Sequence, residues 1–252
     1  TNTTAEGNTA VGFGSLRLTT TGGSNTGIGQ NALLSNTTGA RNVGVGVSAG
    51  VAITTGAYNV LMGAYAGDAI TTGEQNVAVG DAALSANITG TDNVSIGDQS
   101  LKVSTASNNT AVGSSALIKN TTGTTNTAAG HTVMNQNTTG ANNVAMGSGA
   151  LANNTTASNN IAIGTSALFA NTTGTQNVTV GGLAGDANVT GNYNTLIGYN
   201  AGGALDGNYN AFLGRSSGSA VTSGTKNSII GSYNGNQNSL DIRAASNNIV
   251  LS

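Results

Sequence analysis

Apolar and polar residues alternate over short stretches that return along nearly the whole chain. Residues 76–80 read NVAVG and residues 109–113 read NTAVG, so each stretch starts with Asn and ends with Gly. The fourth position of every stretch is apolar, and the second is Val, Ile, Thr or a small residue. An alternation with a period of two over about five residues, ended by Gly, predicts a short β-strand.

The stretches belong to a longer repeat, whose places we number from its first Asn. Successive first-place Asn residues are 17 apart, except for intervals of 16 between Asn93 and Asn109 and between Asn194 and Asn210. A Gly follows each of them four residues later. The predicted ladder residues are Asn8, Asn25, Asn42, Asn59, Asn76, Asn93, Asn109, Asn126, Asn143, Asn160, Asn177, Asn194, Asn210 and Asn227, with Gly12, Gly29, Gly46, Gly63, Gly80, Gly97, Gly113, Gly130, Gly147, Gly164, Gly181, Gly198, Gly214 and Gly231.

The second half of the repeat, typified by NTTG at residues 36–39, predicts another short strand and then a turn, because Asn and Gly adopt positive φ at little cost. Two short strands and two turns suit one coil of a parallel β-solenoid. About fourteen such coils, stacked at ~4.8 Å, would make a rod of roughly 65 Å. We therefore predict an all-β parallel β-solenoid or β-roll over residues 1–235. Residues 236–252 are expected to form a C-terminal strand segment that caps the array or leads to a next domain, with a partial fifteenth repeat from Asn248.

Stacked coils would place like residues on like residues. Each first-place amide would then bond the amides above and below it, and the Gly ladder would mark a corner where a Cβ would clash or where φ is positive. The ninth place is Leu in seven repeats and Gly in several others. Because a missing core Leu costs about 2–5 kcal/mol, we expect the lost volume to be restored from across the coil. The aliphatic residues that follow a ninth-place Gly by three or four positions are Ile53, Ile70, Val189, Leu205 and Val221.

The composition excludes several functional classes. Charged residues make up 6% of the chain and the net charge is −2, which argues against binding to nucleic acid or to acidic membrane surfaces. No apolar run approaches the roughly 18 residues that insert into a bilayer. There is no Cys, hence no disulfide framework or thiolate metal site. The chain begins with Thr1, so we interpret it as a fragment or a processed product.

One coil of this size buries little apolar area relative to the conformational entropy lost when its residues are ordered. The third and eighth places are mostly Ala and would form a second flat, weakly apolar surface. The third place grows to Leu196, Phe212 and Ile229 near the C-terminus. We predict that this surface packs against copies of itself, as a homotrimer.

The phrases NVAVG, NVAMG, NIAIG and NTAVG are each followed by two variable residues, then Ala, then Leu or Gly. They resemble the head repeats of trimeric autotransporter adhesins. They resemble even more the NTTG-spaced arrays of phage tail-fibre proteins, over residues 8–231. The tail SLDIRAASNNIVLS (residues 239–252) is similar to the segment that leads toward a self-cleaving chaperone domain in marine phage fibres. The resemblance implies a left-handed parallel β-roll with three chains per fibre. The adhesin repeat is shorter, and we expect neither a stalk coiled coil nor a membrane anchor within these residues.

Residues that could carry chemistry are sparse. His131 is the sole histidine, at a corner where we expect solvent exposure, so a His-based metal cluster cannot be built. Asp81 and Asp98 share the sixth place of adjacent coils and could bridge a cation, but the calcium-binding solenoid signature GGxGxD is missing. The glycines of residues 44–50 resemble a dinucleotide loop only superficially. We predict no catalytic residue, no cofactor and no metal, and hence no enzyme.

Two hypotheses concern surfaces. Tyr193 and Tyr209 occupy the same place of adjacent coils, with Tyr199 nearby, and could form a sugar-binding platform. The alternative is that these rings cap the last coils or line the seam of the trimer. Ice binding would need two outward Thr columns, whereas neighbouring Thr residues point to opposite faces. The Thr ladder in question is Thr38, Thr55, Thr72, Thr89, Thr105, Thr122, Thr139, Thr156 and Thr173.

Together these patterns favour an extracellular, non-enzymatic fibre segment of a phage tail fibre or adhesin. It would serve as a stiff spacer and as an element of attachment to a host-surface glycan or receptor. The alternative is a bacterial cell-surface trimeric adhesin or an extracellular filament protein. An ice-binding solenoid is less favoured.

Overall fold

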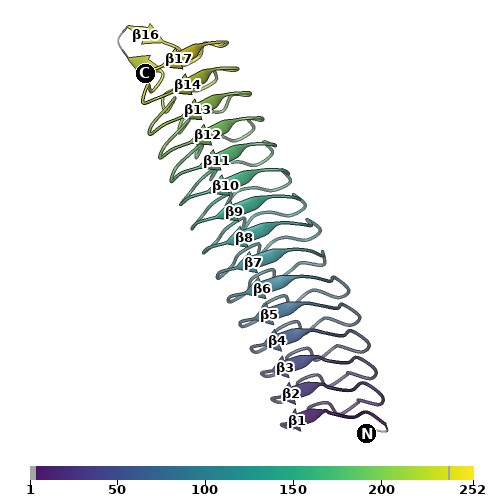
Figure 1. Ribbon diagram of the computed structural model, residues 1–252. Coiled ribbons are helices and arrows are strands. Elements are labelled where there is room, and N and C mark those ends of the chain that lie inside the picture. The colour runs from purple at the N-terminus through teal and green to yellow at the C-terminus, as the bar shows by residue number, and fades with distance from the viewer. Residues whose placement is uncertain (1–3, 238) are drawn as a thin grey trace. The chain divides into compact units, whose positions relative to one another are not determined.

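The computed structural model describes residues 4–237 and 239–252, in two compact units, Thr1–Thr125 and Asn126–Ser252. Both units are all-β parallel solenoids, and together they hold about 14 turns of about 17 residues each (Figure 1). Each turn contributes one three-residue strand to a parallel sheet on one side of the turn. The predicted fold class is confirmed at this level.

The strands of each unit follow one another in chain order. The first unit holds β1 (Thr9–Val11), β2 (Thr26–Ile28), β3 (Val43–Val45), β4 (Val60–Met62), β5 (Val77–Val79), β6 (Val94–Ile96) and β7 (Thr110–Val112). The second unit holds β8 (Thr127–Ala129), β9 (Val144–Met146), β10 (Ile161–Ile163), β11 (Val178–Val180), β12 (Thr195–Ile197), β13 (Ala211–Leu213), β14 (Ser228–Ile230), β15 (Asn236–Gln237), β16 (Leu240–Asp241) and β17 (Ile249–Leu251).

The register between neighbouring strands equals the repeat length. Val77 of β5 pairs with Val60 of β4 on one side and with Val94 of β6 on the other, and both partners are one full repeat away along the chain. Where a turn is one residue shorter, the register shortens with it, as for Thr195 and Ala211. Each place of the repeat therefore stacks on the same place of the next turn.

The second half of each turn is not the extended strand that we predicted. Residues in its seventh and ninth places and in its last place have positive φ, for example Gln99 (54°), Leu101 (46°) and Asn108 (61°). Left-handed residues at alternate places interrupt an extended backbone, although the turns stay bonded, as from Leu101 N–H to Ala116 O (3.0 Å). The Asn and Gly of NTTG, which we expected to supply positive φ, do not adopt it.

The interior of the solenoid is lined by the places that we assigned to an oligomer surface. Third-place Ala78 and eighth-place Ala83 are fully buried inside their turn. Leu196, Phe212 and Ile229 are also fully buried, in one core cluster. The predicted contact face between chains was therefore wrong, because the middle residue of each strand points inward.

Compensation for the ninth-place Gly is confirmed at two positions and wrong at a third. A Cβ at Gly50 would lie 3.1 Å from Ile53 Cδ1, and one at Gly67 would lie 2.8 Å from Ile70 Cδ1. These Ile side chains therefore fill the space of the absent Leu together with Leu61, which lies 2.7 and 2.8 Å from the two Cβ positions. Val189 is 38% exposed and fills nothing. Its turn instead has a buried Asn188 in the twelfth place, which four other turns fill with Ile53, Ile70, Leu205 or Val221.

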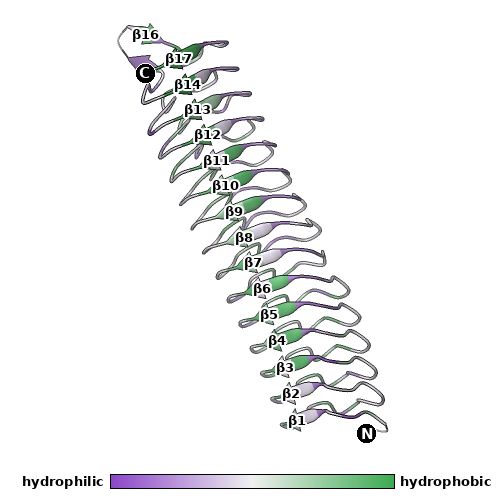
Figure 2. Ribbon diagram, viewed as in Figure 1, coloured by the Kyte–Doolittle hydropathy of each residue, from purple (hydrophilic) through white to green (hydrophobic). Residues whose placement is uncertain are grey.

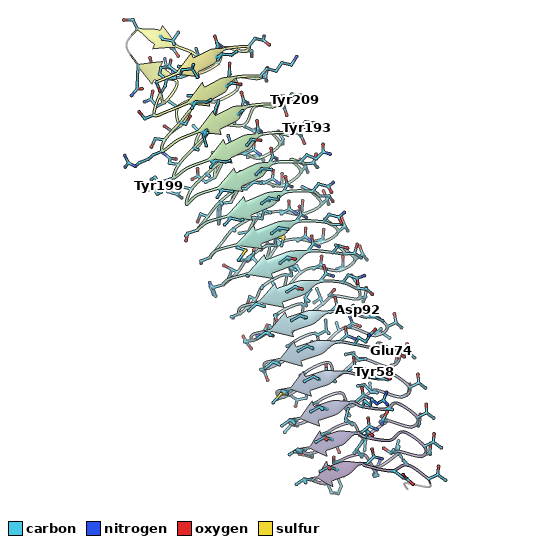
Figure 3. The ribbon with its side chains drawn as sticks, viewed as in Figure 1. Tyr58, Glu74, Asp92, Tyr193, Tyr199 and Tyr209 are labelled. Carbon is cyan, nitrogen blue, oxygen red and sulfur yellow. The ribbon has the colours of Figure 1, made fainter. Side chains whose placement is uncertain are left out.

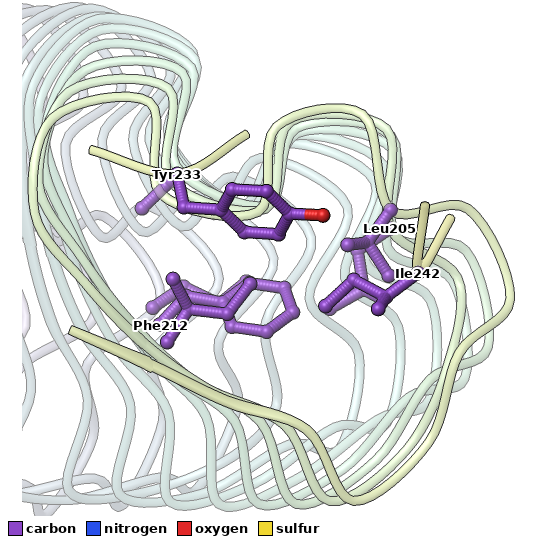
Figure 4. Close-up of a cluster of buried hydrophobic side chains, with 8 residues drawn as sticks. Leu205, Phe212, Tyr233 and Ile242 are labelled. Carbon is purple, nitrogen blue, oxygen red and sulfur yellow. The ribbon is translucent and has the colours of Figure 1, made fainter. Parts of the chain in front are cut away.

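The C-terminal residues close the interior of the second unit and continue its sheet. The short antiparallel pair β15–β16 interrupts the repeat, and Tyr233 and Ile242 pack with Leu205 and Phe212 (Figure 4). Strand β17 then pairs with β14, and Asn248 N–H donates to Asn227 Oδ1 (3.0 Å). The sequence from Asn248 thus forms a further rung, after a longer interval than the regular repeat.

Candidate functional site

The first-place Asn side chains form a hydrogen-bonded ladder inside each unit. Asn76 Nδ2 donates to Asn59 Oδ1 (3.1 Å) and to the carbonyl oxygen of Gly90 (2.9 Å). Asn76 Oδ1 accepts the backbone N–H and the Nδ2–H of Asn93 (both 3.1 Å). All three Asn side chains are fully buried. The amide therefore does two things: it ties adjacent turns together, and it holds the corner of its own turn closed.

The fifth-place Gly ladder needs glycine for two separate reasons. Gly80 has φ +136°, a region that side chains other than hydrogen rarely permit. A Cβ added to Gly80 would also lie 2.5 Å from the carbonyl oxygen of Gly97 in the next turn. The same column has φ between 116° (Gly231) and 139° (Gly181).

A second buried Asn column, in the twelfth place, was not foreseen from the sequence. Asn154 Nδ2 donates to Asn137 Oδ1 (2.7 Å), Asn171 to Asn154 (3.0 Å) and Asn188 to Asn171 (3.3 Å). The run ends because Leu205 holds this place in the next turn, and Asn188 Oδ1 is buried with no partner among the described residues. We had interpreted these Asn residues as turn formers, which hid their role as ladder residues.

The second and fourth places of the strands form an outward apolar surface, which we call the outward strand face. In β4 and β6 the middle residue is buried, whereas Met62 is 42% and Ile96 is 38% exposed. None of the residues on this face is charged. Figure 2 shows β3–β6 and β9–β11 in green, the colour of hydrophobic residues. Over β12–β14 the face has a shallow groove of about 250 Å³, because Thr195, Ala211 and Ser228 are small.

The structure separates the three predicted tyrosines into two places. The rings of Tyr193 and Tyr209 stack in parallel, with centroids 4.7 Å apart and planes 5° apart. Tyr199 lies on the opposite side of the turns (Figure 3), with the Arg215 guanidinium 6.0 Å from its ring centroid. Stacking covers one face of Tyr193 and of Tyr209, so a sugar could reach only the outer faces and edges of this pair. Contact with a glycan stays a prediction.

The Thr residues after each twelfth place do not form equivalent columns. Thr37 Oγ1 donates to the carbonyl oxygen of Thr54 (3.0 Å) and is half-buried, whereas Thr38 is exposed. The hydroxyl of Thr105 donates to Thr121 O (3.1 Å), so Thr105 belongs to the inner column with Thr37 and not to the ladder that we listed. The assignment was wrong there because its turn has one residue fewer.

The ionisable residues are dispersed. His131 is exposed, with its hydroxyl neighbour Thr132, and Asp81 and Asp98 are exposed at the sixth place. Within residues 4–237 and 239–252, no group of three or more His, Cys, Asp or Glu side chains is placed to hold a metal ion. Burial raises the pKa of Asp68, against the partly opposing effect of two backbone N–H groups, its own and that of Ala69.

One exposed ion pair lies near the C-terminus. Arg243 Nη2 is 2.7 Å from Asp241 Oδ2, and the hydrogen bonds from Arg243 lower the pKa of Asp241 to about 2. The two residues line an open depression with Thr222, Ala244 and Ala245. Because both side chains are half-exposed and already paired, the depression offers no reactive group.

Comparisons with protein-family models, with curated proteins and with solved structures find no match for this chain. The described part of the chain contains no helix that is both long and apolar enough to cross a membrane.

Proposed function

We propose that this chain is a structural, non-enzymatic segment of an extracellular fibre, either a phage tail fibre or a related adhesin. The observation that carries the proposal is the buried first-place Asn column, which joins successive turns by side-chain hydrogen bonds. The twelfth-place column adds such bonds between Asn137 and Asn188. Such an array resists bending at every turn, which is the property of a stiff spacer. The resemblance of NVAVG and NTTG to fibre repeats supports the same conclusion, and a bacterial surface adhesin or filament is the alternative.

We further propose that the fibre is a left-handed homotrimer whose chains meet through the outward strand face. Soluble monomers rarely expose a contiguous apolar patch larger than a few hundred Å². Here Val60, Met62, Val77, Val79 and their equivalents lie exposed or half-buried turn after turn. Burial between chains would remove this surface from water and would supply the apolar area that a single thin coil lacks.

The assembly is tested by measuring mass in solution together with electron microscopy. We expect three times the chain mass of 24.4 kDa, and straight particles. Val79→Asp should shift the mass toward one chain, because a charge would be buried at the interface. Ile88→Asp is the matched control, since Ile88 is 49% exposed and lies at a corner away from the strand face. A monomeric wild type, or equal effects of both variants, would contradict this assembly.

Attachment is a separate property from the spacer role. If the fibre binds a surface glycan through the Tyr193–Tyr209 pair, binding should saturate and should be lost in Tyr193→Ala or Tyr209→Ala. If the segment is a spacer alone, neither change alters adhesion to any tested surface. Both variants should keep the mass of the wild type, because the two rings are half-exposed on the corner.

A further inference from the structure

At several regular corners, backbone N–H groups converge on one oxygen of the next turn. The N–H groups of Thr37, Thr38 and Gly39 all donate to the carbonyl oxygen of Thr54, at 2.9, 3.2 and 3.3 Å. In the same way, the N–H groups of Thr54, Thr55 and Gly56 all donate to the carbonyl oxygen of Thr71. Three successive N–H groups of this kind form a concave site with partial positive charge, which suits an oxygen atom with negative charge.

In the second unit, one corner is filled by a carboxylate. The turn after residues 189–191 is one residue shorter than the regular repeat, and Asp206 holds its thirteenth place, from which Thr54 and Thr71 supply the carbonyl oxygen at the regular corners. Asp206 Oδ1 takes that position and accepts the N–H groups of Val189 (3.0 Å), Thr190 (2.8 Å) and Gly191 (3.0 Å). The Thr190 hydroxyl adds a long contact of 3.4 Å. A carboxylate oxygen therefore fits this corner.

In the first unit, the equivalent corner is open. Residues 88–90 also face a turn that is one residue short, and Thr105 stands where Asp206 stands in the second unit. The Thr105 hydroxyl donates to Thr121 O (3.1 Å) and accepts none of the N–H groups of residues 88–90. Within the described residues, none of the three N–H groups of residues 88–90 donates a hydrogen bond, whereas all three do at the corners formed by residues 37–39 and 54–56. Ile88 and Thr89 are exposed at this corner, and Gly90 is buried, as Gly191 is at the corner of Asp206.

We infer that the backbone N–H groups of Ile88, Thr89 and Gly90 form a binding site for the carboxylate of an organic acid. The site would take one oxygen, as the corner around Asp206 does, through charge-assisted hydrogen bonds. Asp92 follows Gly90 by two residues and carries the same charge as the ligand, so we expect weak binding, on the order of millimolar. The inference does not depend on the proposed fibre function.

The test is a titration followed by backbone amide NMR at constant ionic strength. Sodium acetate is the probe, and acetamide, its neutral analogue, is the control ligand. The N–H signals of Ile88, Thr89 and Gly90 should shift and saturate with acetate and not with acetamide. Residues 189–191 provide an internal control, since Asp206 already occupies their corner.

Two variants exchange the states of the corners. Thr105→Asp should fill the first corner and abolish the acetate response there, whereas Asp206→Ala should open the second corner and create a response at residues 189–191. No saturable shift at residues 88–90 in the wild type would mean that water alone fills the corner, and would overturn the inference. An equal response to acetamide, or no gain in Asp206→Ala, would overturn it as well. A titration with N-acetylneuraminic acid then distinguishes two sources of the carboxylate. Tighter binding than that of acetate would indicate an acidic sugar as the ligand, and equal binding would indicate that the site accepts any carboxylate.

Discussion

The amide of a ladder Asn can be tested by a change that keeps its shape. Asn76→Asp replaces Nδ2 by an oxygen and leaves the size of the side chain nearly unchanged. In the structure, Nδ2 supplies the hydrogen for two contacts, to Asn59 Oδ1 at 3.1 Å and to Gly90 O at 2.9 Å. In the variant, oxygen would face oxygen at both contacts, inside a fully buried site.

Each buried acceptor left without its donor costs about 1–3 kcal/mol. Gly90 O loses this donor, whereas Asn59 Oδ1 keeps the backbone N–H of Asn76 (3.0 Å). One unpaired acceptor beside a buried carboxylate predicts a loss of about 3 kcal/mol in the free energy of unfolding at pH 7, a large share of the roughly 5–15 kcal/mol that is typical of a domain. Burial also raises the pKa of the new carboxyl group above its value in the unfolded chain. The loss should therefore shrink as the pH falls through that raised folded-state pKa, because the protonated acid can donate one hydrogen bond.

The assay is guanidinium denaturation followed by circular dichroism, at one chain concentration because assembly adds to apparent stability. Asn108→Asp is the matched control, since it makes the same chemical change at an exposed last-place residue. We expect the control to change stability by less than about 0.5 kcal/mol. If Asn76→Asp and Asn108→Asp unfold at the same denaturant concentration, the ladder amide does not stabilise the fold as argued.

Three further predictions concern backbone and charge. Gly80→Ala should lower the thermal midpoint far more than Gly149→Ala, because a Cβ at Gly80 meets a backbone oxygen at 2.5 Å, whereas one at Gly149 meets nothing closer than 3.6 Å; equal shifts would contradict the clash. Arg243→Ala should raise the pKa of Asp241 from about 2 toward 3.8, measured by NMR titration; the pair thus contributes stability above the unfolded-state pKa, lost as the pH falls from about 4 to about 2. Asp68→Asn should gain stability relative to wild type as the pH rises above 3.8, since the wild-type carboxyl has a raised pKa and loses stability on ionising; a difference that does not change with pH between 3 and 7 would count against this.

The period, the strand and the stacked register could be predicted from the sequence because the same residue pattern recurs in every repeat. A constant spacing with Gly four residues after Asn leaves few structures other than a parallel stack, and Val77 does pair with Val60 and Val94. The direction of the side chains could not be read in the same way. In V-A-V, alternation alone does not say whether Ala78 or its Val neighbours face inward, and we chose the larger residues.

The physical reason for that error lies in the size of the interior. The narrow turn already holds a ninth-place Leu and two Asn side chains, so a strand can add only a small middle residue such as Ala78. Where the ninth place is Gly, the middle residue is larger in five of six turns, with Gly44 as the exception. A Cβ at Gly218, for example, would lie 2.4 Å from the ring of Phe212. This inverse relation between the third and ninth places is visible in the sequence, and it would have identified the inward face. The carboxylate of Asp206 left no such signal, because it substitutes for a backbone atom.

A register equal to the repeat length also determines how the length of this protein can change. Excision of residues 143–159 would bring Ile161 beside Thr127 and Asn171 beside Asn137, so that each residue meets a neighbour of the kind it had before. Insertion of a copied turn would do the same. Gains and losses of whole turns therefore preserve every column, and one rung is the increment by which the length of this solenoid can change.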